Sequence, residues 1–331
     1  MQRAPLCLLT CDDARDLGEG IAADLRVTLT PGHEVWFPVG EAKYVIDSRL
    51  RGNDVYILQR TIVPGGAHSL YDNFLMALHA ADAARIADAD RVTLVLPYLP
   101  GTRQDKRKEH AREGISTGLF ARMIEAAGVS MVITVEPHTD AVIGCYDPRR
   151  CVLESVDITR PFGRYLREQG LVGEVVASPD VGGLQQARDY GNYLKCDLAA
   201  LSKERDYSKT SVVTHTTVLG EVRGRDVLLV DDIVDTGGSV VSAAEALWEA
   251  GAAGILVAAA HPVFSDPAWQ RMHQLAERAR ERGVRFAVAG TDSILHPNAP
   301  AFYRDFSLVS LLANVIRQVN TRGSVRAMER P

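Results

Sequence analysis

The chain has few cysteines, and none of them stands in a pattern that would bind zinc or build a disulfide framework. Its 331 residues include five cysteines, an odd number, with no Cys-x-x-Cys pair among them. Small secreted domains depend on paired cysteines, whereas reduced thiols are usual in the cytoplasm. The cysteine content therefore predicts a cytoplasmic protein without structural disulfides.

Long apolar segments and an excess of positive charge are also missing. The amino terminus MQRAPLCLLTCDDARD has too short an apolar run for a signal peptide. The longest apolar run, GAAGILVAAA, falls well below the ~18 residues that a membrane helix needs. The net charge is −5, which disfavours binding to a polyanionic backbone. We therefore expect no membrane span and no sequence-independent binding of nucleic acid.

Short runs rich in Val, Ile and Leu alternate with longer stretches of helical periodicity, which is typical of parallel α/β proteins. The chain is 46% hydrophobic and long enough for two domains. We predict an α/β fold of two similar domains, each with a mostly parallel sheet flanked by helices. Ligands should bind beyond the carboxyl ends of the strands. The expected strands are 54–59, 91–98, 131–137, 173–180, 226–232, 254–261 and 285–290, and the expected helices are 71–87, 117–128, 184–194 and 239–251.

The stretch DVLLVDDIVDTGGSV, residues 226–240, combines a buried strand, paired carboxylates and a glycine-rich helix start. Free N–H groups at the helix start, with the hydroxyls of Thr236 and Ser239, suit a phosphate monoester. Because carboxylates repel phosphate, Asp231 and Asp232 should face a magnesium ion or neighbouring hydroxyls of the same ligand. A ribose 5-phosphate moiety offers both a phosphate and a vicinal diol. The alternative is a pair of solvated acids that merely cap a helix.

Other polar segments follow expected strands. Five positive charges (Arg103, Lys106, Arg107, Lys108 and Arg112) stand in residues 103–112, and this density suits a polyphosphate, although a solvated charged face is the ordinary alternative. Lys203 and Arg205 open a long polar segment that we expect to be a loop or hairpin, able to close over a transferring phosphoryl group. His138 and Asp180 each follow a strand and are candidates for a magnesium and phosphate site.

These segments resemble a known family. VLLVDDIVDTGGS looks like the phosphoribosyl pyrophosphate loop of type I phosphoribosyltransferases and of ribose-phosphate pyrophosphokinases. TRQDKRK, VITVEPHTDAVIGCYD, VVASPDVGGLQQARDY and SKER are similar to further segments of the pyrophosphokinases, and the likeness extends over nearly the whole chain. Ordinary phosphoribosyltransferases are shorter and lack the Arg-Gln-Asp segment. The resemblance therefore favours the pyrophosphokinase family.

The resemblance implies transfer of the β,γ-diphosphoryl group of Mg-ATP to the anomeric hydroxyl of ribose 5-phosphate, which gives phosphoribosyl pyrophosphate and AMP. It implies Mg²⁺ as cofactor, ATP and ribose 5-phosphate as ligands, and a homo-oligomer built on dimers, such as a hexamer. The corresponding domains would be residues 1–155, joined by the C-terminal segment 306–331, and residues 156–305.

The resemblance also implies roles for individual residues. Lys203, Arg205 and His138 would act on the transferring group, and His138 and Asp180 would stand at the metal. ATP would be bound by Phe37, Glu41, Arg103, Gln104 and Asp105. Ribose 5-phosphate would be held by Asp231, Asp232, Asp235, Thr236, Gly237, Gly238 and Ser239.

Two positions depart from the family pattern, and two other functions stay open. In FPVGE, Val39 replaces an acidic or amide residue on the adenine side, and Glu136-Pro137-His138 stands where the family has Asp-Leu-His. A non-catalytic regulatory relative of the synthetase is one alternative, although the retained Lys203 and Arg205 argue against it. A phosphoribosyltransferase that uses phosphoribosyl pyrophosphate is the other.

Overall fold

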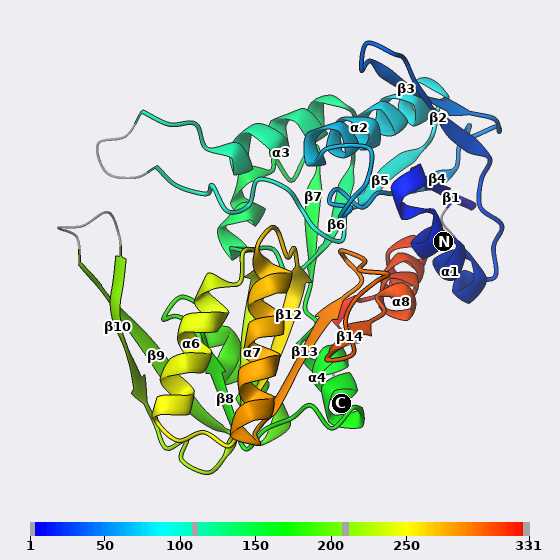
Figure 1. Ribbon diagram of the computed structural model, residues 1–331. Helices are drawn as coiled ribbons and strands as arrows, with labels where there is room; N and C mark the ends of the chain where they lie inside the picture. The colour runs from blue at the N-terminus through cyan, green and yellow to red at the C-terminus, as the bar shows by residue number, and fades with distance from the viewer. Residues whose placement is uncertain (1–3, 108–111, 207–211, 327–331) are drawn as a thin grey trace. The chain divides into compact units, whose positions relative to one another are not determined.

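The computed structural model describes residues 4–107, 112–206 and 212–326, and for residues 203–206 and 212–215 it describes the backbone only. The chain divides into two compact units (Figure 1). The first contains Met1–Asp157 and Ser307–Pro331, and the second contains Ile158–Phe306. Each unit has its own sheet and its own buried core, so each is described separately.

The first unit is built on a five-stranded sheet in which every pair of neighbouring strands is parallel. The strand order is β1-β4-β5-β6-β7, and an antiparallel hairpin, β2–β3, stands apart from this sheet. The strands are β1 (Leu6–Thr10), β2 (Gly32–Trp36), β3 (Ala42–Ile46), β4 (Asp54–Leu58), β5 (Arg91–Val95), β6 (Met131–Val135) and β7 (Val152–Val156). The helices are η1 (Asp12–Ala14), α1 (Arg15–Leu25), α2 (Leu70–Ile86), α3 (Ser116–Ala126), η2 (Asp140–Cys145) and α8 (Val309–Thr321).

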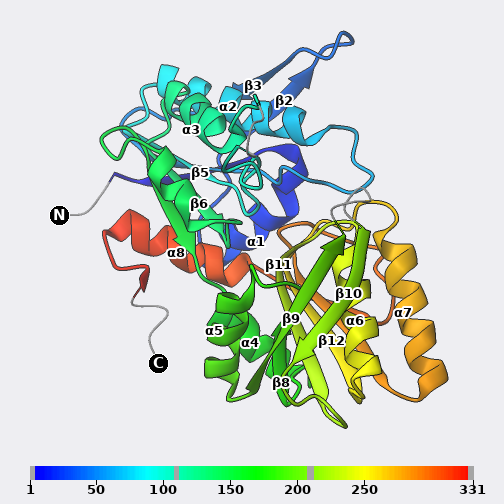
Figure 2. The same ribbon diagram turned by 90° about the vertical axis from the view of Figure 1, so that its left-hand side faces the viewer.

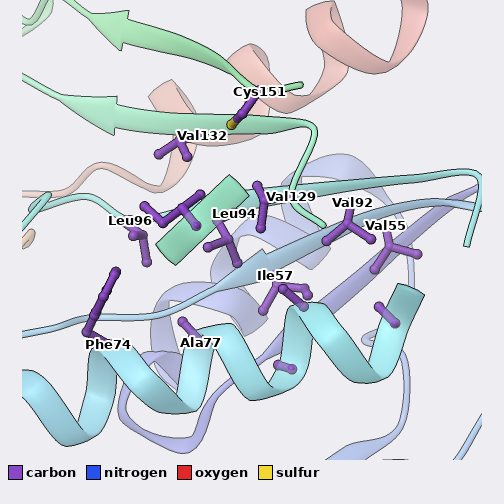
Figure 3. Packing of buried hydrophobic residues seen from close by; sticks show 14 of the residues in the cluster. Val55, Ile57, Phe74, Ala77, Val92, Leu94, Leu96, Val129, Val132 and Cys151 are labelled. Carbon is purple, nitrogen blue, oxygen red and sulfur yellow. The ribbon is translucent and has the colours of Figure 1, made fainter. Parts of the chain in front are cut away.

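Helix α2 packs its buried face on the central strands of this sheet. Phe74 and Ala77 lie against the layer formed by Ile57 and Leu94 (Figure 3). The helix begins at a capping box, in which the Ser69 hydroxyl accepts a hydrogen bond from the backbone of the third helical residue and that residue's carboxylate accepts one in return. The cap and the apolar face together explain why this stretch is a helix at this position.

Helix α8 brings the end of the chain back to the first unit. The Arg317 guanidinium donates to the Asp24 carboxylate at 3.0 Å, and the Ser310 hydroxyl donates to the same side chain at 3.1 Å. The Asn320 amide donates to Asp54 at 2.9 Å. These contacts bind α8 to α1 and to the first residue of β4.

The second unit has a seven-stranded sheet in the order β10-β9-β8-β11-β12-β13-β14. All neighbouring strands are parallel except the β9–β10 pair. Helices α6 and α7 cover one face, and α4 and α5 cover the other (Figures 1 and 2). The strands are β8 (Val175–Ser178), β9 (Asp197–Asp206), β10 (Val212–Leu219), β11 (Asp226–Val234), β12 (Gly254–Pro262), β13 (Arg285–Thr291) and β14 (Tyr303–Phe306). The helices are α4 (Thr159–Glu168), α5 (Leu184–Leu194), α6 (Gly238–Glu249) and α7 (Ala268–Arg282).

The predicted fold class is confirmed, and all seven expected strands and four expected helices are present. The described backbone of the polar segment after Lys203 forms the antiparallel pair β9–β10. Of the two expected forms, loop or hairpin, the structure has the hairpin pairing. Sequence patterning did not identify α7, because a helix with this many charged residues shows only a narrow apolar stripe. The five cysteines are all free thiols. In the described ranges no helix is both long and apolar enough to cross a membrane.

Candidate active site

Strand β11 carries the acidic loop at its carboxyl end. The strand lies between β8 and β12, and Val227–Val230 are buried between the helical layers. Asp231 and Asp232 follow directly and are half-buried. The Asp232 carboxylate accepts a hydrogen bond from the backbone N–H of Ile233 at 2.9 Å. The two acids therefore stand where the strand emerges from the core, at the edge where ligands bind in parallel sheets.

Gly237 forms the turn between this loop and α6. Its φ of 74° lies in the left-handed region, and a Cβ there would stand 2.9 Å from the Cε of Met272 on α7. Both facts favour glycine. In the part of the chain that the structure describes, no side chain caps the start of α6, so the first-turn N–H groups can bind an anion such as phosphate. The neighbouring Thr236 and Ser239 are exposed and supply two hydroxyls.

Asp180 organises the loop after β8, which is the parallel neighbour of β11. One oxygen of its carboxylate, Oδ1, accepts hydrogen bonds from the N–H groups of Gly182 at 2.9 Å and Gly183 at 3.2 Å. The Ser178 hydroxyl in turn accepts from the Asp180 N–H at 3.4 Å. Asp180 thus closes its own loop and keeps a second carboxylate oxygen for a ligand.

The surroundings of Asp231 change the acidity of its side chain. Burial raises the pKa of Asp231 well above its usual value, and the negative charge of Asp232 and a hydrogen bond with it raise this pKa further. The charge of Asp180 contributes in the same direction. Burial beside two further negative charges therefore favours a bound proton on Asp231.

In the first unit, the basic segment follows β5 and is anchored by α3. The Gln104 side chain accepts a hydrogen bond from the Ser116 hydroxyl. The Thr117 hydroxyl lies 2.9 Å from the carbonyl oxygen of Gly101 and 3.1 Å from that of Gln104, and the Thr117 N–H donates to the latter at 3.4 Å. Arg103 and Gln104 are exposed, whereas Asp105 is half-buried. The anchored backbone therefore presents Arg103 and Gln104 toward solvent.

His138 follows β6, the parallel neighbour of β5, and its side chain is exposed. Because the carboxyl ends of parallel strands meet at one edge, the structure brings the His138 loop and the Arg103–Asp105 segment to the same edge of the first sheet. Glu136, which starts this loop, has a φ of 39°. A non-glycine residue with positive φ is uncommon and marks a constrained turn.

Phe37 and Glu41 lie at the tip of the β2–β3 hairpin, apart from these loops. The Phe37 N–H donates to the Glu41 carbonyl at 2.8 Å, which closes the turn. The Phe37 side chain is 44% exposed, and Val39 is 81% exposed. The Lys43 Nζ lies 5.9 Å from the centre of the Phe37 ring. The hairpin tip therefore presents an aromatic ring and a cation to solvent.

Lys203 and Arg205 belong to β9 by their backbone, where they are in register with Thr216 and Val213 of β10. Their side chains lie outside what the structure describes, as does the whole of Lys108. Among the described residues, no group of three or more His, Cys, Asp or Glu side chains is arranged to hold a metal ion.

Sequence reasoning missed one residue at the phosphate loop. Arg271 on α7 donates from Nη1 to the carbonyl oxygen of Thr236 at 2.7 Å. The two residues are 35 positions apart. Arg271 is one of several charged residues of its helix, so the sequence pattern does not mark it as part of the site.

Comparisons with known proteins agree with this architecture. The model for the N-terminal domain of ribose phosphate pyrophosphokinase matches residues 6–128, and the phosphoribosyl transferase domain model matches residues 162–278. A ribose-phosphate pyrophosphokinase of Haemophilus ducreyi is 34% identical over 323 residues, which cover 95% of each chain. One from Chromobacterium violaceum is 34% identical, covering 94% of this chain and 90% of its own.

A solved structure is also similar over nearly the full length. The crystal structure of phosphoribosylpyrophosphate synthetase from Mycobacterium smegmatis has 30% sequence identity and a TM-score of 0.84, and the match covers 96% of this chain and 100% of that one. Likeness of sequence and of fold thus extends through both units. The chain belongs to the ribose-phosphate pyrophosphokinase family.

Proposed function

We propose that the protein transfers the β,γ-diphosphoryl group of ATP to the anomeric hydroxyl of ribose 5-phosphate, giving phosphoribosyl pyrophosphate and AMP. The observation that carries the proposal is the end of β11, where paired acids lead through Gly237 into the uncapped start of α6. Acids for hydroxyls and N–H groups for phosphate occur in one loop, and a sugar phosphate needs both.

Each part of this loop has its own task. Asp231 and Asp232 bind the ribose hydroxyls through their carboxyl oxygens, which can accept a hydrogen bond whether or not the carboxyl carries a proton. Thr236, Gly237 and Ser239 bind the 5-phosphate through hydroxyls and backbone N–H groups. Asp235 and Gly238 complete this binding loop.

The ATP side of the reaction has its own residues. Arg103, Gln104 and Asp105 bind the nucleotide, and Phe37 and Glu41 of the β2–β3 hairpin contact its base and sugar. Lys203 and Arg205 neutralise charge on the transferring diphosphoryl group, since phosphoryl transfer depends mainly on positioning and on charge stabilisation.

Mg²⁺ is the proposed cofactor, assigned to Asp180 and His138. Burial raises the pKa of Asp231, and the negative charges of Asp232 and Asp180 raise it further, so a hard cation at this edge would offset that charge. Magnesium is usually held by one or two carboxylates together with substrate phosphates and water, so a full protein cage is not required. When bound, the metal neutralises phosphate charge; Asp180 offers it the carboxylate oxygen that its loop leaves free.

The oligomeric state and the compartment belong to the same proposal. We propose a cytoplasmic homo-oligomer built on dimers, such as a hexamer. The free thiols agree with a reducing compartment.

The reaction can be tested directly by chromatography of the nucleotides. Purified protein with ATP, Mg²⁺ and ribose 5-phosphate should release AMP and form phosphoribosyl pyrophosphate in equal amounts, and no AMP should appear when ribose replaces ribose 5-phosphate. Asp231→Asn combined with Asp232→Asn should abolish the product, whereas Glu249→Gln, at the exposed far end of α6, should not. A folded protein that releases no AMP would contradict the proposal, and base-dependent consumption of phosphoribosyl pyrophosphate would favour a phosphoribosyltransferase.

A further inference from the structure

Helix α7 packs on the phosphate loop from one side. Ala268, Arg271 and Met272 lie on the same face of the helix, as residues three and four apart do. Ala268 and Met272 are fully buried, and both approach the position that a Cβ at Gly237 would occupy. The Arg271 guanidinium lies next to them, 3.6 Å from the corresponding position at Gly238.

The one hydrogen bond from Arg271 fixes a peptide group of the loop. Its Nη1 donates to the Thr236 carbonyl at 2.7 Å. Within the described ranges this is the one acceptor that the guanidinium contacts, and no carboxylate forms an ion pair with it. A guanidinium with five donors whose one hydrogen bond to a described residue goes to a backbone carbonyl is well placed to orient that peptide.

Orientation of this peptide decides whether the loop attracts or repels phosphate. In a trans peptide the carbonyl and the following N–H point in opposite directions. With the Thr236 carbonyl held toward α7, the Gly237 N–H points away from α7. If the peptide rotated, the carbonyl oxygen would take the place of that N–H and would repel a phosphate oxygen.

Gly237 makes such a rotation inexpensive, because glycine occupies left-handed and right-handed backbone conformations about equally well. The φ of 74° at Gly237 is therefore not held by the residue itself. A contact from outside the loop can hold the peptide, and the hydrogen bond from Arg271 to the Thr236 carbonyl is such a contact.

We propose that Arg271 is a positioning residue that locks the Thr236–Gly237 peptide in its phosphate-binding orientation and so makes the site selective for a 5-phosphorylated sugar. This inference rests on the proposed function, which assigns the loop to ribose 5-phosphate. It adds a residue of another helix, outside the loop, to the determinants of substrate choice.

The test compares Arg271→Met, which keeps most of the length but has no donor, with Arg271→Lys, which keeps a donor and the charge. Arg278→Met is the matched control, because Arg278 lies on the same helix and pairs with Glu245 of α6, away from the loop. Binding of ribose 5-phosphate and of inorganic phosphate is measured by calorimetry without ATP, and KM and kcat are measured by AMP release.

We expect Arg271→Met to weaken binding of ribose 5-phosphate by about tenfold or more, the effect of one lost charge-assisted hydrogen bond. The KM for ribose 5-phosphate should rise to match, while the KM for ATP and kcat stay within about twofold of the wild type. Arg271→Lys should recover most of the affinity, and Arg278→Met should bind as the wild type does.

Two results would overturn the inference. One is wild-type affinity for ribose 5-phosphate in a folded Arg271→Met protein. The other is an equal loss in Arg271→Met and Arg278→Met, which would assign the effect to the packing of α6 on α7. The calorimetric comparison needs no turnover, so a protein that binds ribose 5-phosphate but releases no AMP would contradict the proposed reaction and still decide the role of Arg271.

Discussion

Burial raises the pKa of Asp231, and the carboxylate of Asp180 lies near enough for its negative charge to raise that pKa further, although Asp231 lies in β11 and Asp180 follows β8. The parallel pairing of β8 with β11 is what brings them together. The acidic loop therefore keeps a carboxyl partly buried near other negative charges, which is unfavourable for folding and is common at ligand-binding sites.

Replacing Asp231 by Asn should stabilise the metal-free protein at neutral pH. Because the folded chain holds the Asp231 proton more tightly than the unfolded chain does, this residue contributes stability that is present below its unfolded pKa and is lost as the pH rises. An amide stays neutral, so the free energy of unfolding of Asp231→Asn should exceed that of the wild type by at least about 1 kcal/mol near neutral pH. Denaturation in EDTA at several pH values measures this difference.

The gain should shrink as the pH falls toward the unfolded pKa of an aspartate, and ribose 5-phosphate affinity should fall in the same variant. Glu249→Gln, at an exposed position, should show no such pH-dependent gain. If the free energies of unfolding of Asp231→Asn and the wild type differed by the same amount at every pH, the pKa of Asp231 would not be raised in the folded protein.

Gly237→Ala should destabilise the protein and also weaken ribose 5-phosphate binding. An alanine at a φ of 74° costs about 1 kcal/mol, and its Cβ would crowd Met272. Gly224→Ala is the matched control, because Gly224 has a φ of 70° with no atom within 4 Å of the added Cβ.

Thermal unfolding should detect a loss in both variants, since each forces a left-handed alanine. Titration with ribose 5-phosphate should detect a loss in Gly237→Ala alone. Equal binding by the two variants would remove the turn at Gly237 from the phosphate site.

Thr117→Val should raise the KM for ATP and leave the KM for ribose 5-phosphate unchanged. The hydroxyl of Thr117 holds the carbonyls of Gly101 and Gln104, so its loss frees the segment that carries Arg103. One lost buried hydrogen bond costs about 1–2 kcal/mol, which corresponds to roughly a tenfold change in KM. Steady-state kinetics of AMP release with each substrate varied in turn measures the two constants.

Thr93→Val supplies the control for the preceding substitution. Thr93 lies in β5 and is fully buried, and its hydroxyl has no hydrogen-bond partner among the described residues. The valine should therefore be neutral or slightly stabilising, with wild-type KM for ATP. If Thr93→Val and Thr117→Val raise this KM alike, the anchoring contacts of Thr117 are not the cause.

Lys203→Ala should lower kcat by an amount equivalent to about 3 kcal/mol of barrier and leave ribose 5-phosphate binding nearly intact. The reason is that a cation at the transferring group acts on charge that develops in the transition state. Lys195→Ala, at the exposed end of α5, should keep wild-type turnover. Unchanged turnover in Lys203→Ala would remove the β9–β10 hairpin from the mechanism.

Features formed by residues that are adjacent in the chain could be predicted from the sequence. The acids, the glycine turn and the start of α6 occupy adjacent positions 231–239, so their order alone indicates a phosphate-binding turn. Alternation of apolar runs with helical periodicity likewise predicted the parallel sheets, because fully buried strands must be apolar on both faces. Edge strands such as β7 and charged helices such as α7 were not predicted, because one exposed face weakens the apolar pattern.

The tertiary structure decided which distant residues serve the site. Strand pairing brought Asp180 within electrostatic range of Asp231, packing of α3 anchored the segment of Arg103 through Thr117, and packing of α7 brought Arg271 to Thr236. None of these pairs is close in the chain, and each depends on a register or a helix contact that no local pattern encodes. Sequence determined the chemistry of each loop because chemistry resides in adjacent side chains, whereas only the folded chain determined which loops meet and how their peptides and charges are held.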